Sequence, residues 1–263
     1  MESILFLIIS FLASTVGAIC GIGGGVIIKP TLDFFKMADV ATISFLSGCT
    51  VLAMSCYSVG RGFIAKEKMI DLRTAAPLSI GAAIGGILGK ELFTLIKNSA
   101  PNANLVGGIQ AACLAALTIM TLVYTLLKSR IKTHELKGIV PGVLIGCALG
   151  LLSSFLGIGG GPINLVVLAF FFSMPTKKAA ANSLFIILFS QLASLIMTLV
   201  TRTVPAFRWQ DLLLMIAGGI LGGVVGRIFS KKMSEKAVDV LFIILMCIII
   251  LISIYNTWHY FSL

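Results

Sequence analysis

Charged residues divide this 263-residue chain into eight long charge-free windows. A charged side chain facing lipid costs several kcal/mol, and a crossing helix needs about 20 mainly apolar residues. Windows of this length therefore indicate membrane spans, and a charged content of only 11% with a mean hydropathy of +1.09 excludes an ordinary soluble domain. The windows are residues 3–28, 40–60, 74–89, 98–127, 138–176, 179–201, 212–226 and 240–263.

The window at 138–176 is too long for one crossing, and we expect it to break inside the membrane. Its break coincides with a repeated motif, GIGGG, which occurs at Gly21–Gly25 and again at Gly157–Gly161. A second set of glycines also recurs with nearly the same offset, as Gly81, Gly85, Gly86 and Gly89 and then as Gly218, Gly222, Gly223 and Gly226. The sequence therefore predicts one integral domain made of two repeats, residues 1–127 and 138–263, joined by a basic cytoplasmic linker at 128–137.

The distribution of Lys and Arg between the loops tests how the glycine-broken windows run. If every window crosses, the two sides carry 10 and 9 basic residues, which is no bias. If the first and fifth windows are re-entrant, one side carries 14 and the other 5. The positive-inside rule favours the second model, in which each repeat has three crossings and the two repeats are inverted, as in secondary transporters. A broken but crossing helix remains the alternative, because residues 3–20 and 138–156 are nearly full-length helices.

Each GIGGG run is followed at once by a new helical pattern, which places a helix N-terminus within the membrane. Free N–H groups and a positive dipole end make such a terminus suitable for binding an anion. The alternative is that the glycines only permit close helix packing, which is our interpretation of the second glycine set. Lys29, four residues after the first run, is either a substrate ligand or a lysine that snorkels to a helix end.

Polar residues at the starts of the following helices are expected to complete the lining of this site, although such residues also serve as hydrogen-bonding groups between helices. Asn164 lies three residues after the second glycine run and offers an amide to an oxyanion. The candidate substrate-binding residues are Gly21, Gly23, Gly24, Gly25, Lys29, Thr42, Ser44, Gly157, Gly159, Gly160, Gly161, Asn164, Asn182 and Ser183.

Residues for chemical catalysis are scarce in the sequence. Neither a paired nucleophile and base nor two carboxylates deep within the spans is evident, and the six cysteines lie in apolar windows at no metal-ligand spacing. The basic clusters lie between spans and lack a nucleic-acid-binding motif. We therefore expect a protein that moves a substrate, with no enzymatic activity, cofactor, metal or nucleic-acid partner.

The segments GAICGIGGGVIIKPTL and GLLSSFLGIGGGPINLVVL, each followed by a segment such as ISFLSG or AAANSLFIIL, resemble the sulfite exporter TauE/SafE family, also called the TSUP family. The resemblance covers essentially the whole chain. It implies an integral membrane transporter that moves sulfur-containing anions, such as sulfite or sulfonates, usually outward across the cytoplasmic membrane.

Three hypotheses follow. The first is an exporter of a small sulfur-containing anion in the cell membrane, which the inside-negative potential would drive without a coupled ion. The second is an importer or exchanger of another small anion, such as a carboxylate, on the same scaffold. The third is a membrane scaffold without a transport cycle. The glycine-rich faces are also compatible with a homodimer.

Overall fold

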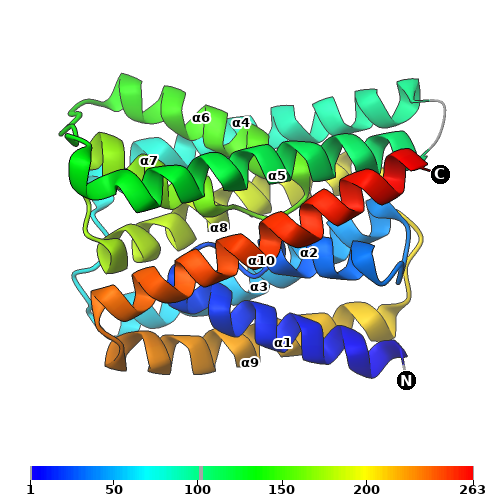
Figure 1. Cartoon of the computed structure of the whole chain (residues 1–263), viewed down its shortest axis with the longest axis horizontal. Coiled ribbons are helices and arrows are strands. Elements are labelled where there is room, and N and C mark those ends of the chain that lie inside the picture. The colour runs from blue at the N-terminus through cyan, green and yellow to red at the C-terminus, as the bar shows by residue number, and fades with distance from the viewer. Residues whose placement is uncertain (1, 101–102, 263) are drawn as a thin grey trace.

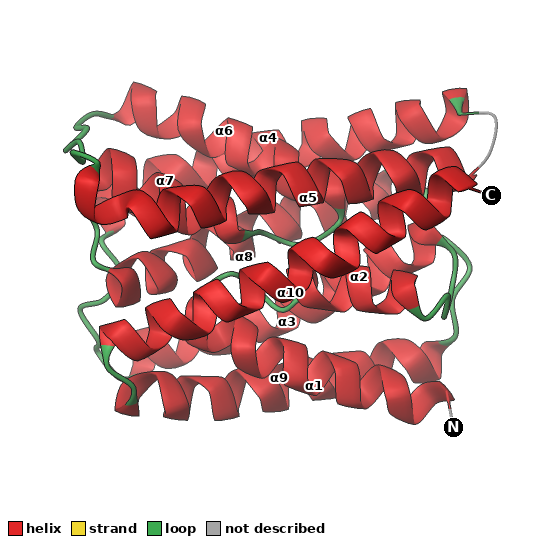
Figure 2. Ribbon diagram, viewed as in Figure 1, coloured by secondary structure: helices red, strands yellow, loops and turns green. Residues whose placement is uncertain are grey.

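The computed structural model describes residues 2–100 and 103–262, and within these ranges it contains ten α-helices, one short 3-10 helix and no strand (Figures 1 and 2). The helices are α1 Glu2–Cys20, α2 Gly25–Phe34, α3 Val40–Ile64, α4 Leu72–Ser99, α5 Ala103–Leu127, α6 Ile139–Leu156, α7 Pro162–Phe172, α8 Thr176–Val200, α9 Trp209–Lys232 and α10 Glu235–Ser262, and the 3-10 helix is Lys128–Arg130. The expected all-helical class is confirmed.

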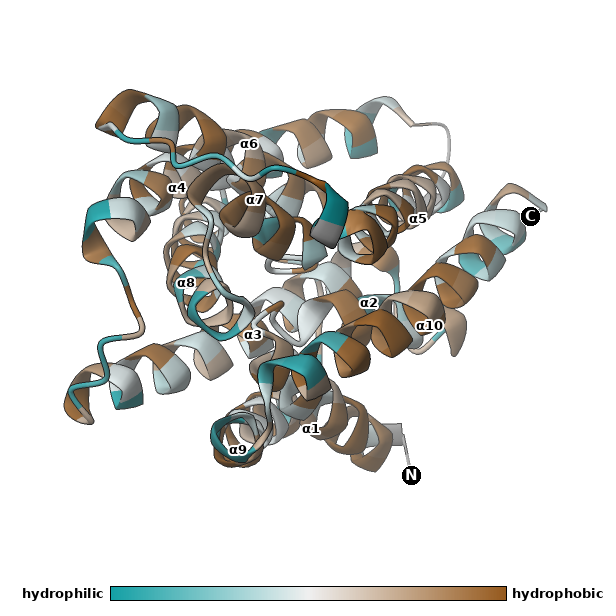
Figure 3. Ribbon diagram, turned by 60° about the vertical axis from the view of Figure 1, so that its left-hand side comes forward, coloured by the Kyte–Doolittle hydropathy of each residue, from teal (hydrophilic) through white to brown (hydrophobic). Residues whose placement is uncertain are grey.

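Eight helices in the described part of the chain are long and apolar enough to cross a membrane: all except α2 and α7. Large apolar side chains on their outer faces are exposed, among them Leu144 on α6 and Leu251 on α10. Figure 3 shows hydrophobic residues along the helices, whereas hydrophilic residues gather in the loops and at the helix ends. Exposed apolar faces of this extent need lipid around them, and the chain is a multi-pass membrane protein.

Both glycine runs interrupt the helices as predicted. The first separates α1 from α2 and the second separates α6 from α7. Gly21 and Gly159 have φ angles of +74° and +71°, in the left-handed region that favours glycine. Pro162 occupies the first turn of α7, where its missing N–H costs no helical hydrogen bond. The overlong window at 138–176 therefore holds two helices, α6 and α7, instead of one.

The loops gather at two ends of the helix bundle. Figure 1 places the loop after α3, the linker after α5, the connection from α7 to α8 and the turn after α9 at one end. The N-terminal end of α1, the loop after α2 and the loop after α8 lie at the other end. We call the first the basic end, because its loops and adjoining helix termini carry 14 Lys and Arg residues against 5 at the opposite end. The chain thus turns back at each glycine break, and the inverted relation of the repeats remains a prediction.

The second set of glycines brings helices of the two halves into backbone contact. α9 packs along α1, and α4 packs along α6. A Cβ atom added to Gly222 would overlap the carbonyl oxygen of Phe11, and one added to Gly85 would overlap that of Cys147. Residues with side chains would hold these helices apart, so the packing interpretation of these glycines is confirmed. Each half therefore contributes one helix that packs along a glycine-rich helix of the other half.

The helices that follow the two breaks, α3 and α8, pack against each other within the bundle. Val51 and Met54 of α3 share a buried apolar cluster with Leu184 and Ile187 of α8. This contact holds both helices next to the glycine runs, and it positions the candidate site.

Candidate functional site

The two glycine runs meet inside the bundle. A Cβ atom added to Gly25 would overlap the carbonyl oxygen of Ile158, and one added to Gly23 would lie 3.7 Å from the carbonyl oxygen of Gly159. Irregular backbone at membrane depth is tolerated when protein buries it, and here each run covers the other. The two breaks are therefore in direct backbone contact within the bundle.

Each run also packs against the helix that follows the other run. A Cβ atom added to Gly21 would overlap Ala180 of α8, and one added to Gly157 would lie 2.6 Å from Cβ and Oγ of Ser44 on α3. Val51 of α3 packs closely on Gly159 in the same way, and Ile187 of α8 packs on Gly160 of the run that precedes its own helix. The glycines thus allow α3 and α8 to close around the breaks.

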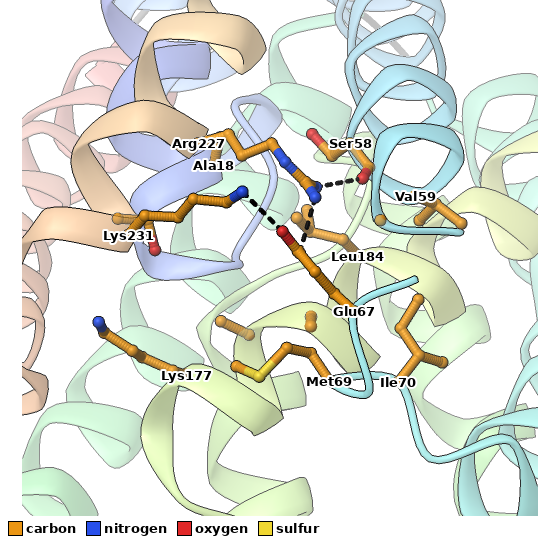
Figure 4. Close-up of a pocket in the computed structure, with 14 residues that line it drawn as sticks. Ala18, Ser58, Val59, Glu67, Met69, Ile70, Lys177, Leu184, Arg227 and Lys231 are labelled. Carbon is orange, nitrogen blue, oxygen red and sulfur yellow. Dashed lines mark hydrogen bonds and ion pairs between the residues drawn. The ribbon is translucent and has the colours of Figure 1, made fainter. Parts of the chain in front are cut away.

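A cavity of about 350 Å³ opens at the basic end, between the loop after α3 and the helices α8 and α9 (Figure 4). Its apolar wall includes Ala18 of α1 and Ala180 of α8, and Ala180 covers Gly21. We call this space the basic cavity, because three cationic side chains and one carboxylate line it: Lys177, Arg227, Lys231 and Glu67. Its charge favours an anion.

The Glu67 carboxylate accepts hydrogen bonds from the two α9 cations that line the cavity, Arg227 and Lys231. Its Oε2 lies 2.7 Å from Nη2 of Arg227, and its Oε1 lies 2.7 Å from Nζ of Lys231 (Figure 4). Nη1 of Arg227 also donates to the carbonyl oxygen of Ser58 at 2.7 Å. Burial raises the pKa of Glu67, but the hydrogen bond from Lys231 and the charge of Arg227 lower it more, and the net pKa lies below its ordinary value.

A second, smaller cavity of about 40 Å³ adjoins the second glycine run. Its lining comes from the halves of α3, α4 and α8 that point toward the opposite end, together with one residue of α5 and the end of α6 (Figure 1). We call it the polar cavity, and its polar lining includes Ser44, Lys90, Gln110, Ser154 and Gln191.

Three buried polar atoms of the polar cavity have no hydrogen-bond partner within the described residues: Oγ of Ser44, Oγ of Ser154 and Nε2 of Gln191. An unpaired buried donor costs about 1–3 kcal/mol. These groups are therefore available to a bound water or ligand. Of the predicted site residues, Ser44 and Gly157 line this cavity together.

Lys29 is buried, and its ammonium group faces the end of α6. Its Nζ donates to the carbonyl oxygen of Leu156 at 2.7 Å and to Oε1 of Gln110, while Nε2 of Gln110 donates to the carbonyl oxygen of Phe155. A cation at a helix C-terminus is favourable, because the last carbonyls are unpaired and carry partial negative charge. Lys29 does not snorkel, and two of its three donors are already used by the protein.

Asn164 and Ser183 are also buried, and each keeps a polar atom without a partner in the described part of the chain. Asn164 lies beside Gly160 and Gly161 in a separate small cavity that is otherwise lined mainly by apolar side chains. Ser183 lies on α8 and is fully buried. Their role in substrate binding stays a prediction.

Thr42 and Asn182 hold loops in place. Thr42 Oγ1 lies within hydrogen-bonding distance of Oδ2 of Asp39 and of the carbonyl oxygen of Ala206, the latter at 2.9 Å, and its single proton can serve either acceptor. The Asn182 side chain accepts from the N–H of Asp71 and donates to the carbonyl oxygens of Met69 and Lys178. Neither residue lines the basic or the polar cavity, and the geometry gives no support to a role for them in binding.

The cations of the basic cavity and Gln110 were not predicted as site residues. Lys177, Arg227 and Lys231 are among the 14 basic residues that indicate topology, and a count of charges per loop does not show which of them face one cavity. Gln110 did leave a signal, since it is an amide in an otherwise apolar stretch of α5. Among the described residues, no group of three or more His, Cys, Asp or Glu side chains is arranged to hold a metal.

Comparison with known proteins decides the family. The family model described as Sulfite exporter TauE/SafE matches residues 6–253. The chain belongs to the TauE/SafE family. Its relatives include the probable membrane transporter protein YunE of Bacillus subtilis (strain 168), which is 26% identical over 216 residues, with 73% of this chain and 76% of the relative covered.

A second relative of this TauE/SafE protein is the probable membrane transporter protein MJ0441 of Methanocaldococcus jannaschii, which is 26% identical over 210 residues, with 76% of this chain and 73% of the relative covered. No solved structure matches the chain significantly. The family and the names of both relatives make this TauE/SafE protein a membrane transporter. The names of the relatives state no substrate, so the substrate belongs to the proposal that follows.

Proposed function

We propose that this TauE/SafE protein exports a small sulfur-containing anion, such as sulfite or a sulfonate, across the cell membrane. The observation that carries the proposal is the pair of cavities on either side of the packed glycine runs. The family description supplies the sulfur chemistry. The cations of the basic cavity support an anionic substrate.

The route runs from the basic end, which the positive-inside rule assigns to the cytoplasm. An anion first enters the basic cavity, where Lys177, Arg227 and Lys231 attract it. The glycine runs then close its path, because Ala180 covers Gly21 and Ser44 covers Gly157. A shift of α3 and α8 relative to the glycine runs opens the way to the polar cavity, whose free hydroxyl and amide groups replace water around the anion.

Alternating access follows if the two repeats are inverted and rock against each other around the paired breaks. The turning back of the chain at both breaks supports this plan (Figure 1). An inside-negative membrane potential favours anion export by about 2.3 kcal/mol per charge per 100 mV. Coupling to protons or sodium is therefore not required.

The second candidate is an importer or exchanger of another small anion, such as a carboxylate. The free hydroxyl and amide groups of Ser44, Ser154 and Gln191 favour it equally, since they suit carboxylate oxygens as well as sulfur oxyanions. A panel of anions competing against sulfite in the flux assay separates the two. Preference for carboxylates would establish the second candidate.

The deciding experiment measures sulfite and sulfonate flux in proteoliposomes under an imposed potential, with protein-free liposomes as the control. We expect flux toward the positive side that increases with the potential. A flux that does not change with the imposed potential contradicts export driven by the membrane potential alone. Absence of flux for every anion tested contradicts transport itself and leaves the scaffold hypothesis.

A further inference from the structure

Glu67 occupies the place between Arg227 and Lys231 that an oxyanion would take, and each of its two oxygens accepts one hydrogen bond at 2.7 Å (Figure 4). We propose that the basic cavity is the entry site for the anion, and that Glu67 is a built-in competitor that the incoming oxyanion displaces. The inference rests on the proposed function and assigns a residue to its first step.

The charges in the cavity do not balance. Three cations face one carboxylate, and Lys177 has no ion pair within the described residues. Figure 4 shows Lys177 set apart from the group formed by Glu67, Arg227 and Lys231. The cavity thus keeps an excess of positive charge while Glu67 is in place, and this excess attracts a second anion.

The ion pairs of Glu67 with Arg227 and Lys231 are accessible to an anion from solution. The side chains of Glu67 and Lys231 are 28% and 59% exposed. Ion pairs that water reaches contribute little to stability, because solvent screens them. Arg227 stays in position when Glu67 leaves, because its Nη1 remains bonded to the carbonyl oxygen of Ser58. An oxyanion that binds Arg227 and Lys231 would therefore replace one set of charged hydrogen bonds with another.

Displacement also has a mechanical consequence. Glu67 belongs to the short loop between α3 and α4, where its N–H donates to the carbonyl oxygen of Gly62 at 3.1 Å, whereas Arg227 and Lys231 belong to α9. The Glu67 carboxylate therefore links a loop of the first half to a helix of the second half, within the lining of the cavity. An anion that displaces Glu67 breaks this link, so binding of an anion in the basic cavity is coupled to release of the loop.

The test measures anion affinity by calorimetry on the full-length protein in nanodiscs, with inorganic sulfate as the probe. Glu67→Gln removes the competing charge and keeps a side chain of similar size, and we expect sulfate to bind at least about 5-fold more tightly, the lower range of a coupling between sites. The matched control is Glu235→Gln, which makes the same charge change at the same end in the exposed first turn of α10. It should leave the affinity nearly unchanged.

Lys177→Gln provides a second test that leaves the Glu67 pair intact, and it keeps the inference falsifiable if Glu67→Gln does not fold. We expect weaker sulfate binding in Lys177→Gln and unchanged binding in the exposed control Lys236→Gln. The inference is overturned if Glu67→Gln binds sulfate with unchanged or weaker affinity. It is also overturned if Glu235→Gln gains as much sulfate affinity as Glu67→Gln, or if Lys177→Gln binds sulfate with unchanged affinity. Binding is measured here without transport, so the two proposals can fail separately. If the affinities change as expected but the protein shows no flux, only the proposed function is contradicted. If the protein shows flux but the affinities do not change, only this inference is contradicted.

Discussion

Nζ of Lys29 donates a hydrogen bond to the carbonyl oxygen of Leu156 at 2.7 Å, and so joins the middle of α2 to the last residue of α6. Each of these helices adjoins a glycine break, and they belong to different halves of the chain. Gln110 of α5 completes the arrangement by accepting from Lys29 and donating to Phe155. The lysine thus stabilises the contact between the two broken elements.

Replacing this lysine should destabilise the fold. In Lys29→Met the carbonyl of Leu156 and Oε1 of Gln110 lose their donor, at a cost of about 1–3 kcal/mol for each buried group left unpaired. Thermal unfolding of the purified protein should show a clear fall in Tm, whereas Lys97→Met, at an exposed site near the end of α4, should not. Normal stability combined with lost substrate binding would instead establish Lys29 as a ligand.

Contact between the glycine runs predicts a strong effect of one methyl group. In Gly25→Ala the added Cβ overlaps the carbonyl oxygen of Ile158, and forcing the two runs apart should cost about 1–3 kcal/mol. Gly60→Ala is the matched control, because a Cβ there meets nothing within 4 Å and alanine is the better helix former by up to about 1 kcal/mol. Comparable Tm values for the two variants would show that the runs do not need their close contact.

Stability and transport should separate at Ser44. Its Oγ has no protein partner in the described structure, so Ser44→Ala breaks no hydrogen bond and should not lower the stability of the fold. If Ser44 binds the anion in the polar cavity, flux should fall about 10-fold, the value of one hydrogen bond to a charged group. Undiminished flux in the stable variant would remove Ser44 from the site.

Asn182 should behave in the opposite way. Asn182→Ala leaves the N–H of Asp71 and the carbonyls of Met69 and Lys178 without a side-chain partner. We expect a loss of about 1–3 kcal/mol in stability and normal flux per folded molecule, measured by Tm and by proteoliposome assay. A stable variant with impaired flux would return Asn182 to the binding site.

The Glu67 pair should respond to acid. Because the pKa of Glu67 is lowered in the folded protein, the pair stabilises the fold above the unfolded pKa, and this contribution is lost as the pH falls through the folded pKa. The Tm difference between the native protein and Glu67→Gln should therefore be largest at neutral pH and shrink on acidification. A difference that does not vary with pH would show that the pKa of Glu67 is the same in the folded and the unfolded protein.

Much of the fold was predictable because the signals are local. The cost of burying a charge acts on every segment separately, so the gaps between charged residues mark the helices, and the glycine runs mark the breaks. The position of Pro162 in the first turn of α7 is also a local property, because its ring fixes φ near the helical value and its missing N–H is not needed in that turn. The interpretation of Gly81 and Gly218 as packing glycines needed only their spacing.

The site was less predictable because it depends on partners that are distant in the chain. Lys29 is separated by 81 residues from Gln110 and by 127 from Leu156, and nothing near it in the sequence indicates a helix end as its neighbour. Asn182 and Ser183 are adjacent in sequence, yet one holds a loop and the other keeps a free hydroxyl. The direction in which each of these side chains faces is decided by how the helices pack.

Short segments of the chain are sufficient to predict the spans, the glycine breaks and the membership of a transporter family, because charge cost, helix length and motif are properties of such segments. Folding is needed to pack the two breaks on each other, to place Lys29 at the end of α6, and to bring Glu67, Arg227 and Lys231 into one cavity. Hydrogen bonds and ion pairs act over only a few ångströms. Their partners are therefore chosen by the folded arrangement of helices.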